Sequence, residues 1–122
     1  MQRDNFNHIA DELIRLGRVT FNLKDAPQKR FALCPNYEEE IAVDKMSVMD
    51  IINYLQHKSP LFIDAIAPIN PNHLYLTISA YDSFYYLGYE IQTDSQKEAE
   101  NFAGHLLLDE IWDAKTEEII FL

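Results

Sequence analysis

The sequence contains few of the residues that build the most recognisable functional sites. Its single cysteine, Cys34, excludes an internal disulfide and a cysteine-rich zinc site. The three glycines are scattered at Gly17, Gly88 and Gly104, so no glycine-rich loop can cradle a phosphate. No apolar segment approaches the about 20 residues that span a bilayer, and no apolar leader follows Met1. These absences predict a cytoplasmic protein without membrane contact or cofactor.

Basic residues are also scarce. Lys and Arg number 10 against 20 Asp and Glu, which gives the 122-residue chain a net charge of -10. Residues 1–30 hold six bases and four acids, and residues 31–122 hold four bases and sixteen acids. An acidic surface argues against direct binding to nucleic acid, whose phosphates it would repel. Two interpretations stay open, a coat that keeps the protein soluble and an acidic face prepared for a basic partner.

Hydrophobic residues make up 48% of the chain and aromatic residues 12%, which predicts one folded domain over residues 1–122. Apolar spacing and turn signals predict the elements in chain order. They are a helix over Asp4–Leu16, a hairpin of Arg18–Lys24 with Phe31–Leu33, an edge strand within Tyr37–Val43, a helix from Ser47 to Ser59, a buried strand over Leu61–Ala67, a hairpin over Leu74–Ile91, a helix from Ser95 and a strand over Glu117–Leu122.

The central hairpin is the best-defined part of the sequence. Alternation on both strands and a turn at Asp82 and Ser83 select one register. That register pairs Leu74 with Ile91, Leu76 with Tyr89, Ile78 with Leu87 and Ala80 with Tyr85. Tyr75 and Tyr86 then lie on the opposite face, where they could belong to a protein interface or to a second core layer beneath a helix.

The segment after Gly104 has two interpretations. The helix that begins at Ser95 is expected to continue to about Asp113 with a mostly buried end. The alternative is a helix that stops near Gly104 and is followed by a strand over Leu106–Trp112. The resulting order, α-β-β-(β)-α-β-β-β-α-β, predicts an α+β domain with a mainly antiparallel sheet of five or six strands and three helices on one face.

Candidate catalytic groups are isolated in the sequence. Asp64 interrupts an apolar strand, which would raise the pKa of its carboxyl as a general acid requires. His8 with Glu12, and His105 with Asp109, are one helical turn apart, but no third ligand is spaced to join either pair. Cys34 lacks the context of a nucleophile. The sequence therefore predicts no catalytic, cofactor-binding or metal-binding residues.

A basic group is expected in the first hairpin, where Lys24 would face Arg30 beside Lys29. Like charges placed opposite each other are destabilising unless an acid lies nearby. The acids Glu38, Glu39 and Glu40 could supply this charge. A second copy of the chain could also do so, which makes a homodimer an alternative.

The charge and size favour a small non-enzymatic protein that masks a basic surface of a partner protein, such as a nuclease or another nucleic-acid-binding protein. Immunity proteins, antitoxins and phage anti-defence proteins have this physical character. The predicted partner-binding residues are Glu38, Glu39, Glu40, Asp44, Tyr75, Tyr86, Asp109, Glu110, Asp113, Glu117 and Glu118. A second hypothesis is a small-molecule pocket between the sheet and the third helix, lined by Phe102, Trp112, Tyr85 and Tyr89. A third is a hydrolase that uses Asp64.

Overall fold

A computed structural model describes residues 3–122, which form three α-helices, a short 3₁₀ helix and one seven-stranded antiparallel sheet. The protein is an α+β domain, which confirms the predicted fold class. Its elements follow in the order α-β-β-β-α-β-β-α-β-β. The elements are α1 (Arg3–Leu16), β1 (Arg18–Phe21), β2 (Phe31–Leu33), β3 (Glu39–Ala42), α2 (Val48–Ile66), η1 (Pro71–His73), β4 (Leu74–Tyr81), β5 (Phe84–Thr93), α3 (Gln96–Leu106), β6 (Glu110–Asp113) and β7 (Glu118–Phe121).

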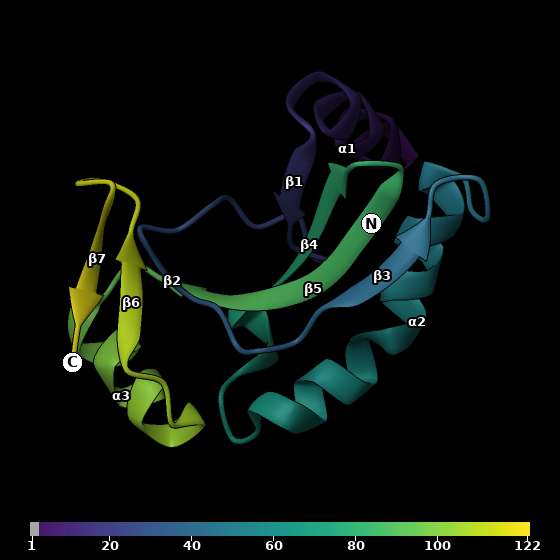
Figure 1. Cartoon of the computed structure of the whole chain (residues 1–122). Helices are drawn as coiled ribbons and strands as arrows, with labels where there is room; N and C mark the ends of the chain where they lie inside the picture. Colours follow the sequence, from purple (N-terminus) through teal and green to yellow (C-terminus); the bar gives the residue numbers. More distant parts are fainter. Residues whose placement is uncertain (1–2) are drawn as a thin grey trace.

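The sheet runs in the order β1-β4-β5-β2-β6-β7, and β3 pairs with the half of β5 that β2 leaves open. Figure 1 shows a strongly curved sheet with α2 and α3 along its outer side and the β6–β7 hairpin at one end. The core lies between the sheet and the helices. It includes Ile51, Ile52, Leu55 and Ile66 of α2 against Leu76, Ile78, Leu87 and Ile91 of the central strands.

The β4–β5 hairpin has the predicted register. Leu74 pairs with Ile91, Leu76 with Tyr89, Ile78 with Leu87 and Ala80 with Tyr85. Asp82 and Ser83 both adopt positive φ angles, of 49° and 69°, as the two central residues of a tight type I′ turn require.

The predicted hairpin between β1 and β2 does not form. β1 pairs with β4, whereas β2 lies between β5 and β6. The chain between them crosses instead of turning back, and the Asn22 side chain fixes its start by donating to the Leu74 carbonyl at 3.0 Å. Alternation determines which face of a strand is buried but not which strand lies beside it.

The predicted strand over Leu61–Ala67 is instead the second half of α2, which continues through Pro60. A proline inside a helix leaves the carbonyl four residues earlier without its usual donor. Here that carbonyl belongs to Gln56, and the Ser59 hydroxyl donates to it at 2.7 Å. This local substitution explains why the helix does not end at Ser59 as the sequence predicted.

The third helix ends at Leu106, so the expected continuation to Asp113 is wrong. A strand follows, as in the alternative, but it spans Glu110–Asp113 and not Leu106–Trp112. Leu107 adopts a left-handed conformation, with φ 58° and ψ 40°, and the Leu108 amide donates to the Ala103 carbonyl at 2.8 Å. This closure is the one that usually has glycine at the left-handed position. Because leucine and not glycine occupies that position, the sequence carries no signal that the helix ends there.

Candidate partner-binding surface

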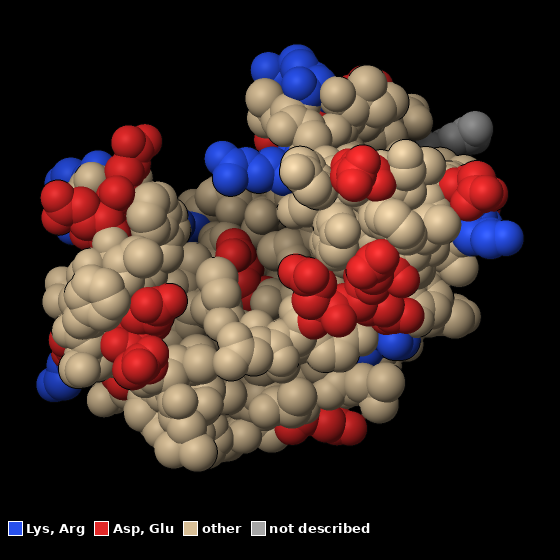
Figure 2. All heavy atoms as spheres, viewed as in Figure 1, with Lys and Arg blue, Asp and Glu red and all other residues tan. Residues whose placement is uncertain are grey.

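Among residues 3–122, one face of the sheet carries no helix, and we call it the open face. The strand registers place Thr77 of β4, Glu90 of β5, Glu40 of β3, and Glu110 and Trp112 of β6 on it. The surface is hollowed between the β6–β7 hairpin and the rest of the molecule, with acidic side chains in and around the hollow and basic side chains at its upper edge (Figure 2). The segment after β1 crosses this face and covers Tyr75, and the rest of the concave face is available to a partner.

An apolar cluster of three side chains lies on the open face of the β6–β7 hairpin. Trp112 pairs with Ile119, and Phe121 is the next residue of β7 on the same face. Their exposed fractions are 40%, 46% and 76%. Large apolar side chains gathered in this way are typical of a protein interface rather than of an ordinary surface. This cluster is absent from the predicted partner-binding residues, although β7 is apolar at consecutive positions on both of its faces.

Acidic side chains surround Tyr86 on the open face. The pKa of its phenol is raised, first by burial and then by Glu40, Glu38 and Asp82. Glu38 and Glu40 are exposed and belong to the predicted set, and the turn residue Asp82 extends it. This group lies on the β3–β5 half of the open face.

A second acidic group lies on the β6–β7 hairpin. Asp109 and Glu110 lie at one end of the hairpin and Glu117 and Glu118 at the other, and all four are exposed. Glu118 pairs with Asp113, so its side chain lies on the face opposite Trp112 and not on the open face. Asp44, in the turn after β3, is exposed as well. Within residues 6–122, no Lys, Arg or His side chain forms an ion pair with any of these acids.

Three of the predicted partner-binding residues are not available. Tyr75 is completely buried, and its hydroxyl donates to the Pro27 carbonyl in the segment that crosses the open face. Glu39 accepts hydrogen bonds from Lys58 and Tyr54 of α2, so it joins β3 to that helix. These two side chains hold the fold together and are removed from the candidate surface.

Asp113 is the third residue that the structure removes. It is buried and accepts two hydrogen bonds from the Arg30 guanidinium, at 2.9 and 2.8 Å. Those hydrogen bonds lower the pKa of the Asp113 carboxyl well below its usual range. The pair fixes β6 beside β2, and its contribution is structural.

The expected basic group is dispersed. Lys24 donates to the Asn72 side chain at 3.0 Å, Lys29 lies 3.7 Å from Asp94, and Arg30 binds Asp113. Lys24 and Arg30 do not face each other because β1 and β2 are not neighbours. The reason to expect a second copy of the chain at these residues is therefore gone.

Glu90 and Cys34 lie together on the floor of the open face. The Cys34 thiol is 3.7 Å from Glu90, and the Gln92 amide donates to the other carboxylate oxygen. Burial raises the pKa of Glu90, and burial followed by the charge of Glu90 raises the pKa of Cys34 to about 11. A nucleophilic cysteine needs the opposite shift, so this thiol is unsuited to attack a substrate.

A hydroxyl, an imidazole and a carboxylate meet where η1 approaches α3, but they do not form a catalytic triad. His73 uses one ring nitrogen on the Gln92 carbonyl at 2.8 Å, and its other nitrogen is 3.6 Å from Glu98. Thr93 donates to the same Glu98 carboxylate rather than to the imidazole. A triad requires the hydroxyl to be next to the base, so this group is structural.

The other candidate catalytic groups are separated as well. Asp64 is exposed on α2, so the enclosed carboxyl expected within a buried strand is not present. His105 bonds the Ala67 carbonyl at 2.8 Å, and Asp109 lies beyond the end of its helix. His8 and Glu12 are 3.8 Å apart on α1. Among the described residues, no three His, Cys, Asp or Glu lie close enough together to hold a metal ion.

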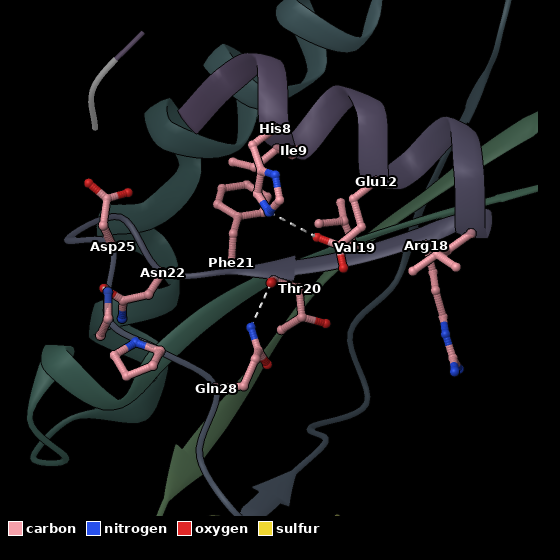
Figure 3. Close-up of a pocket in the computed structure, with 13 residues that line it drawn as sticks. His8, Ile9, Glu12, Arg18, Val19, Thr20, Phe21, Asn22, Asp25 and Gln28 are labelled. Carbon is pink, nitrogen blue, oxygen red and sulfur yellow. Dashed lines mark hydrogen bonds and ion pairs between the residues drawn. The ribbon is translucent and has the colours of Figure 1, made fainter. Parts of the chain in front are cut away.

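The pocket expected between the sheet and the third helix is not formed by its four aromatic residues. Tyr89 stacks on Phe62 inside the core, Phe102 lies against His73, and Trp112 is on the open face. A different pocket of about 640 Å³ lies between α1, β1 and the segment that follows β1. Its charged lining residues are Glu12, Arg18 and Asp25. Arg18 and Asp25 lie at opposite ends, and Glu12 lies between them, 3.8 Å from His8 (Figure 3).

No protein-family model, curated protein or solved structure matches the chain. In the described part of the chain, no helix is both long and apolar enough to cross a membrane.

Proposed function

We propose that the protein is a non-catalytic binding protein whose open face covers a basic surface of a partner protein. The acidic charge of this face suits a nuclease or another nucleic-acid-binding protein as the partner. The protein would then bind its partner as an immunity protein, an antitoxin or an anti-defence protein does. One observation carries the proposal. Exposed apolar side chains and acids without an ion-pair partner in residues 6–122 share a sheet face that has no helix.

The two kinds of side chain have different roles in such a complex. Trp112 and Phe121 would supply the desolvated centre, because aromatic residues carry much of the binding energy of protein interfaces. The acids around Tyr86 and on the β6–β7 hairpin would attract a basic surface and increase the association rate. Because exposed charges are screened within about 8 Å at physiological ionic strength, association should slow as salt increases.

The test begins with the capture and identification of a partner from the native host by the tagged protein. The dissociation constant is then measured for the wild type and for Trp112→Ala and Phe121→Ala. Each variant is expected to weaken binding by about tenfold or more, as truncation of an aromatic anchor does. Ile14→Ala is the matched control, because Ile14 is also a highly exposed apolar residue but lies on α1. Equal affinities for all four proteins would contradict the proposal.

Charge reversal separates the electrostatic part of the proposal. Glu110→Lys reverses a charge on the open face. The control is Glu100→Lys, which makes the same change in net charge at an exposed position of α3. The association rate should fall for Glu110→Lys and stay near the wild-type value for Glu100→Lys. Equal rates for the two variants, or rates that do not depend on salt, would show that charge does not guide binding.

A second candidate function is small-molecule binding in the pocket beside α1. Its volume of about 640 Å³ lies within the range of ligand sites. A thermal-shift screen with metabolites and fragments tests it. A true ligand should lose its stabilising effect in Ala26→Phe, which narrows the pocket, and keep it in Trp112→Ala.

A further inference from the structure

The free edges of the sheet differ in how they are protected. Within residues 3–122, β1, β3 and β7 each have one side without a neighbouring strand. Unpaired backbone groups on such an edge can pair with another chain, and proteins usually guard them with charges, covering loops or capping groups. The state of each edge therefore indicates where a further strand can be added.

The β1 edge is guarded. Gly17 accepts a hydrogen bond from Ala80 of β4, so the alternating pattern directs the backbone of Arg18 and Thr20 outward. The Gln28 side chain donates to the outward Thr20 carbonyl at 2.7 Å, as Figure 3 shows, and the charged Arg18 occupies the other outward position. A strand that approached this edge would have to displace Gln28.

The β3 edge carries a charge. The Val43 amide donates to the Ser83 carbonyl, so the residues of β3 that direct their backbone outward are Glu40 and Ala42. Glu40 is exposed. An acid at the centre of a short edge disfavours the approach of another strand from an acidic protein.

The β7 edge has neither protection. The Leu122 amide donates to the Asp109 carbonyl at 2.9 Å, so Leu122 and Ile120 face β6, and Ile119 and Phe121 direct their backbone outward. Both outward residues are apolar and exposed. In the described part of the chain, β7 is the last strand of the sheet, and Figure 1 shows no helix or strand beyond it. Ile119 and Phe121 thus offer two amides and two carbonyls to another strand.

We propose that β7 pairs antiparallel with β7 of a second copy of the chain, with Ile120 on the two-fold axis. In this register Ile119 lies opposite the partner subunit's Phe121, and the two residues exchange both of their backbone hydrogen bonds. The same pair is repeated by symmetry, so all four outward groups are used. Ile119 and Phe121 lie on either side of Ile120, so a two-fold rotation about Ile120 brings the outward amides and carbonyls of one copy opposite those of the other.

The charges also fit this register. Glu118 lies opposite the partner subunit's Leu122, so acids do not face each other across the axis. The pairing uses the backbone at the edge and leaves Trp112 and Glu110 on the open face of each copy. The inference therefore does not depend on the proposed function, and the dimer would present two acidic faces on one continuous sheet.

Salt distinguishes this contact from the proposed binding of a basic partner. Each copy carries a net charge of -10, so two copies repel each other at long range. Added salt screens that repulsion, and the dimer should become tighter as ionic strength rises. Binding to a basic surface should respond with the opposite sign.

The experiment is sedimentation velocity on the purified chain up to about 1 mM, the range of the weakest specific associations. We expect a monomer–dimer equilibrium whose dissociation constant falls with salt. The double variant Ile119→Lys with Phe121→Lys places lysines opposite lysines in both pairs and should weaken the dimer by about tenfold or more. The double variant Ile119→Lys with Phe121→Glu places opposite charges across the same pairs and should dimerise again.

Both positions are exposed, and circular dichroism and thermal unfolding would confirm that each variant is folded. A protein that stays monomeric over the whole concentration range would overturn the inference. A dimer that both double variants form equally would also overturn it, because the contact would then lie elsewhere.

Discussion

Replacement of Leu107 by glycine tests where α3 ends, because the sign of the change in the free energy of unfolding depends on whether this residue is left-handed or helical. The residue is left-handed, with φ 58° and ψ 40°, and 91% exposed, so its side chain contributes little packing. The left-handed conformation costs a residue with a Cβ about 1–2 kcal/mol. Glycine avoids that cost but loses about 0.5–1 kcal/mol through the greater freedom of its unfolded chain. Leu107→Gly should therefore raise the free energy of unfolding by about 0.5–1 kcal/mol.

The assay is urea unfolding followed by the fluorescence of Trp112, the single tryptophan, which lies on the strand that follows. Leu107→Ala is the matched control, because alanine pays the same conformational cost as leucine and should leave the stability close to that of the wild type. A continuous helix from Ser95 to Asp113 would give the opposite result. Glycine inside a helix would then lower the stability by about 1 kcal/mol, and that outcome would refute the chain reversal at Leu107.

Two further predictions concern carboxylates with shifted pKa values. Because burial raises the pKa of Glu90 above its ordinary value, its ionisation opposes folding as pH rises through that range, and Glu90→Gln should increase stability at neutral pH. The same variant should lower the pKa of Cys34 from about 11 and speed its alkylation by iodoacetamide at fixed pH, and an unchanged rate would contradict the contact. For Glu39, burial acts to raise the pKa, but hydrogen bonds from Lys58 and Tyr54 outweigh it and leave the pKa lowered. The stability that this pair contributes is present above the ordinary value of about 4.3 and is lost as pH falls below it. Lys58→Met should cost about 1–2 kcal/mol at neutral pH and reduce the further loss in acid, whereas Lys45→Met, at an exposed lysine, should change neither.

The elements that could be predicted are those whose determinants lie close together in the chain. In the β4–β5 hairpin, alternation on two adjacent strands and a turn at Asp82 and Ser83 define the register without help from the rest of the molecule. The starts of the helices at Ser47 and Ser95 also depend on nearby residues alone. Each serine hydroxyl accepts a hydrogen bond from the backbone amide three residues later. Acidity beyond residue 30 was a matter of composition.

Two of the errors in secondary structure occur where one side chain replaces the usual determinant. Ser59 supplies the donor that Pro60 lacks, so α2 passes a proline that normally ends a helix. Leu107 takes the conformation that glycine usually takes. Both are single contacts or angles that residue type alone does not specify.

Which acids face a partner was decided by the tertiary structure. Glu39 and Glu40 are neighbours in the sequence, yet Glu39 bonds Lys58 of α2 while Glu40 is exposed on the open face. Asp113 is buried by Arg30, from a segment 83 residues away, and Phe121 is exposed because β7 is the last strand of the sheet. Local sequence determined the β4–β5 hairpin, the helix starts and the total charge, whereas strand neighbours and burial depend on contacts between distant residues, which only the folded chain brings together.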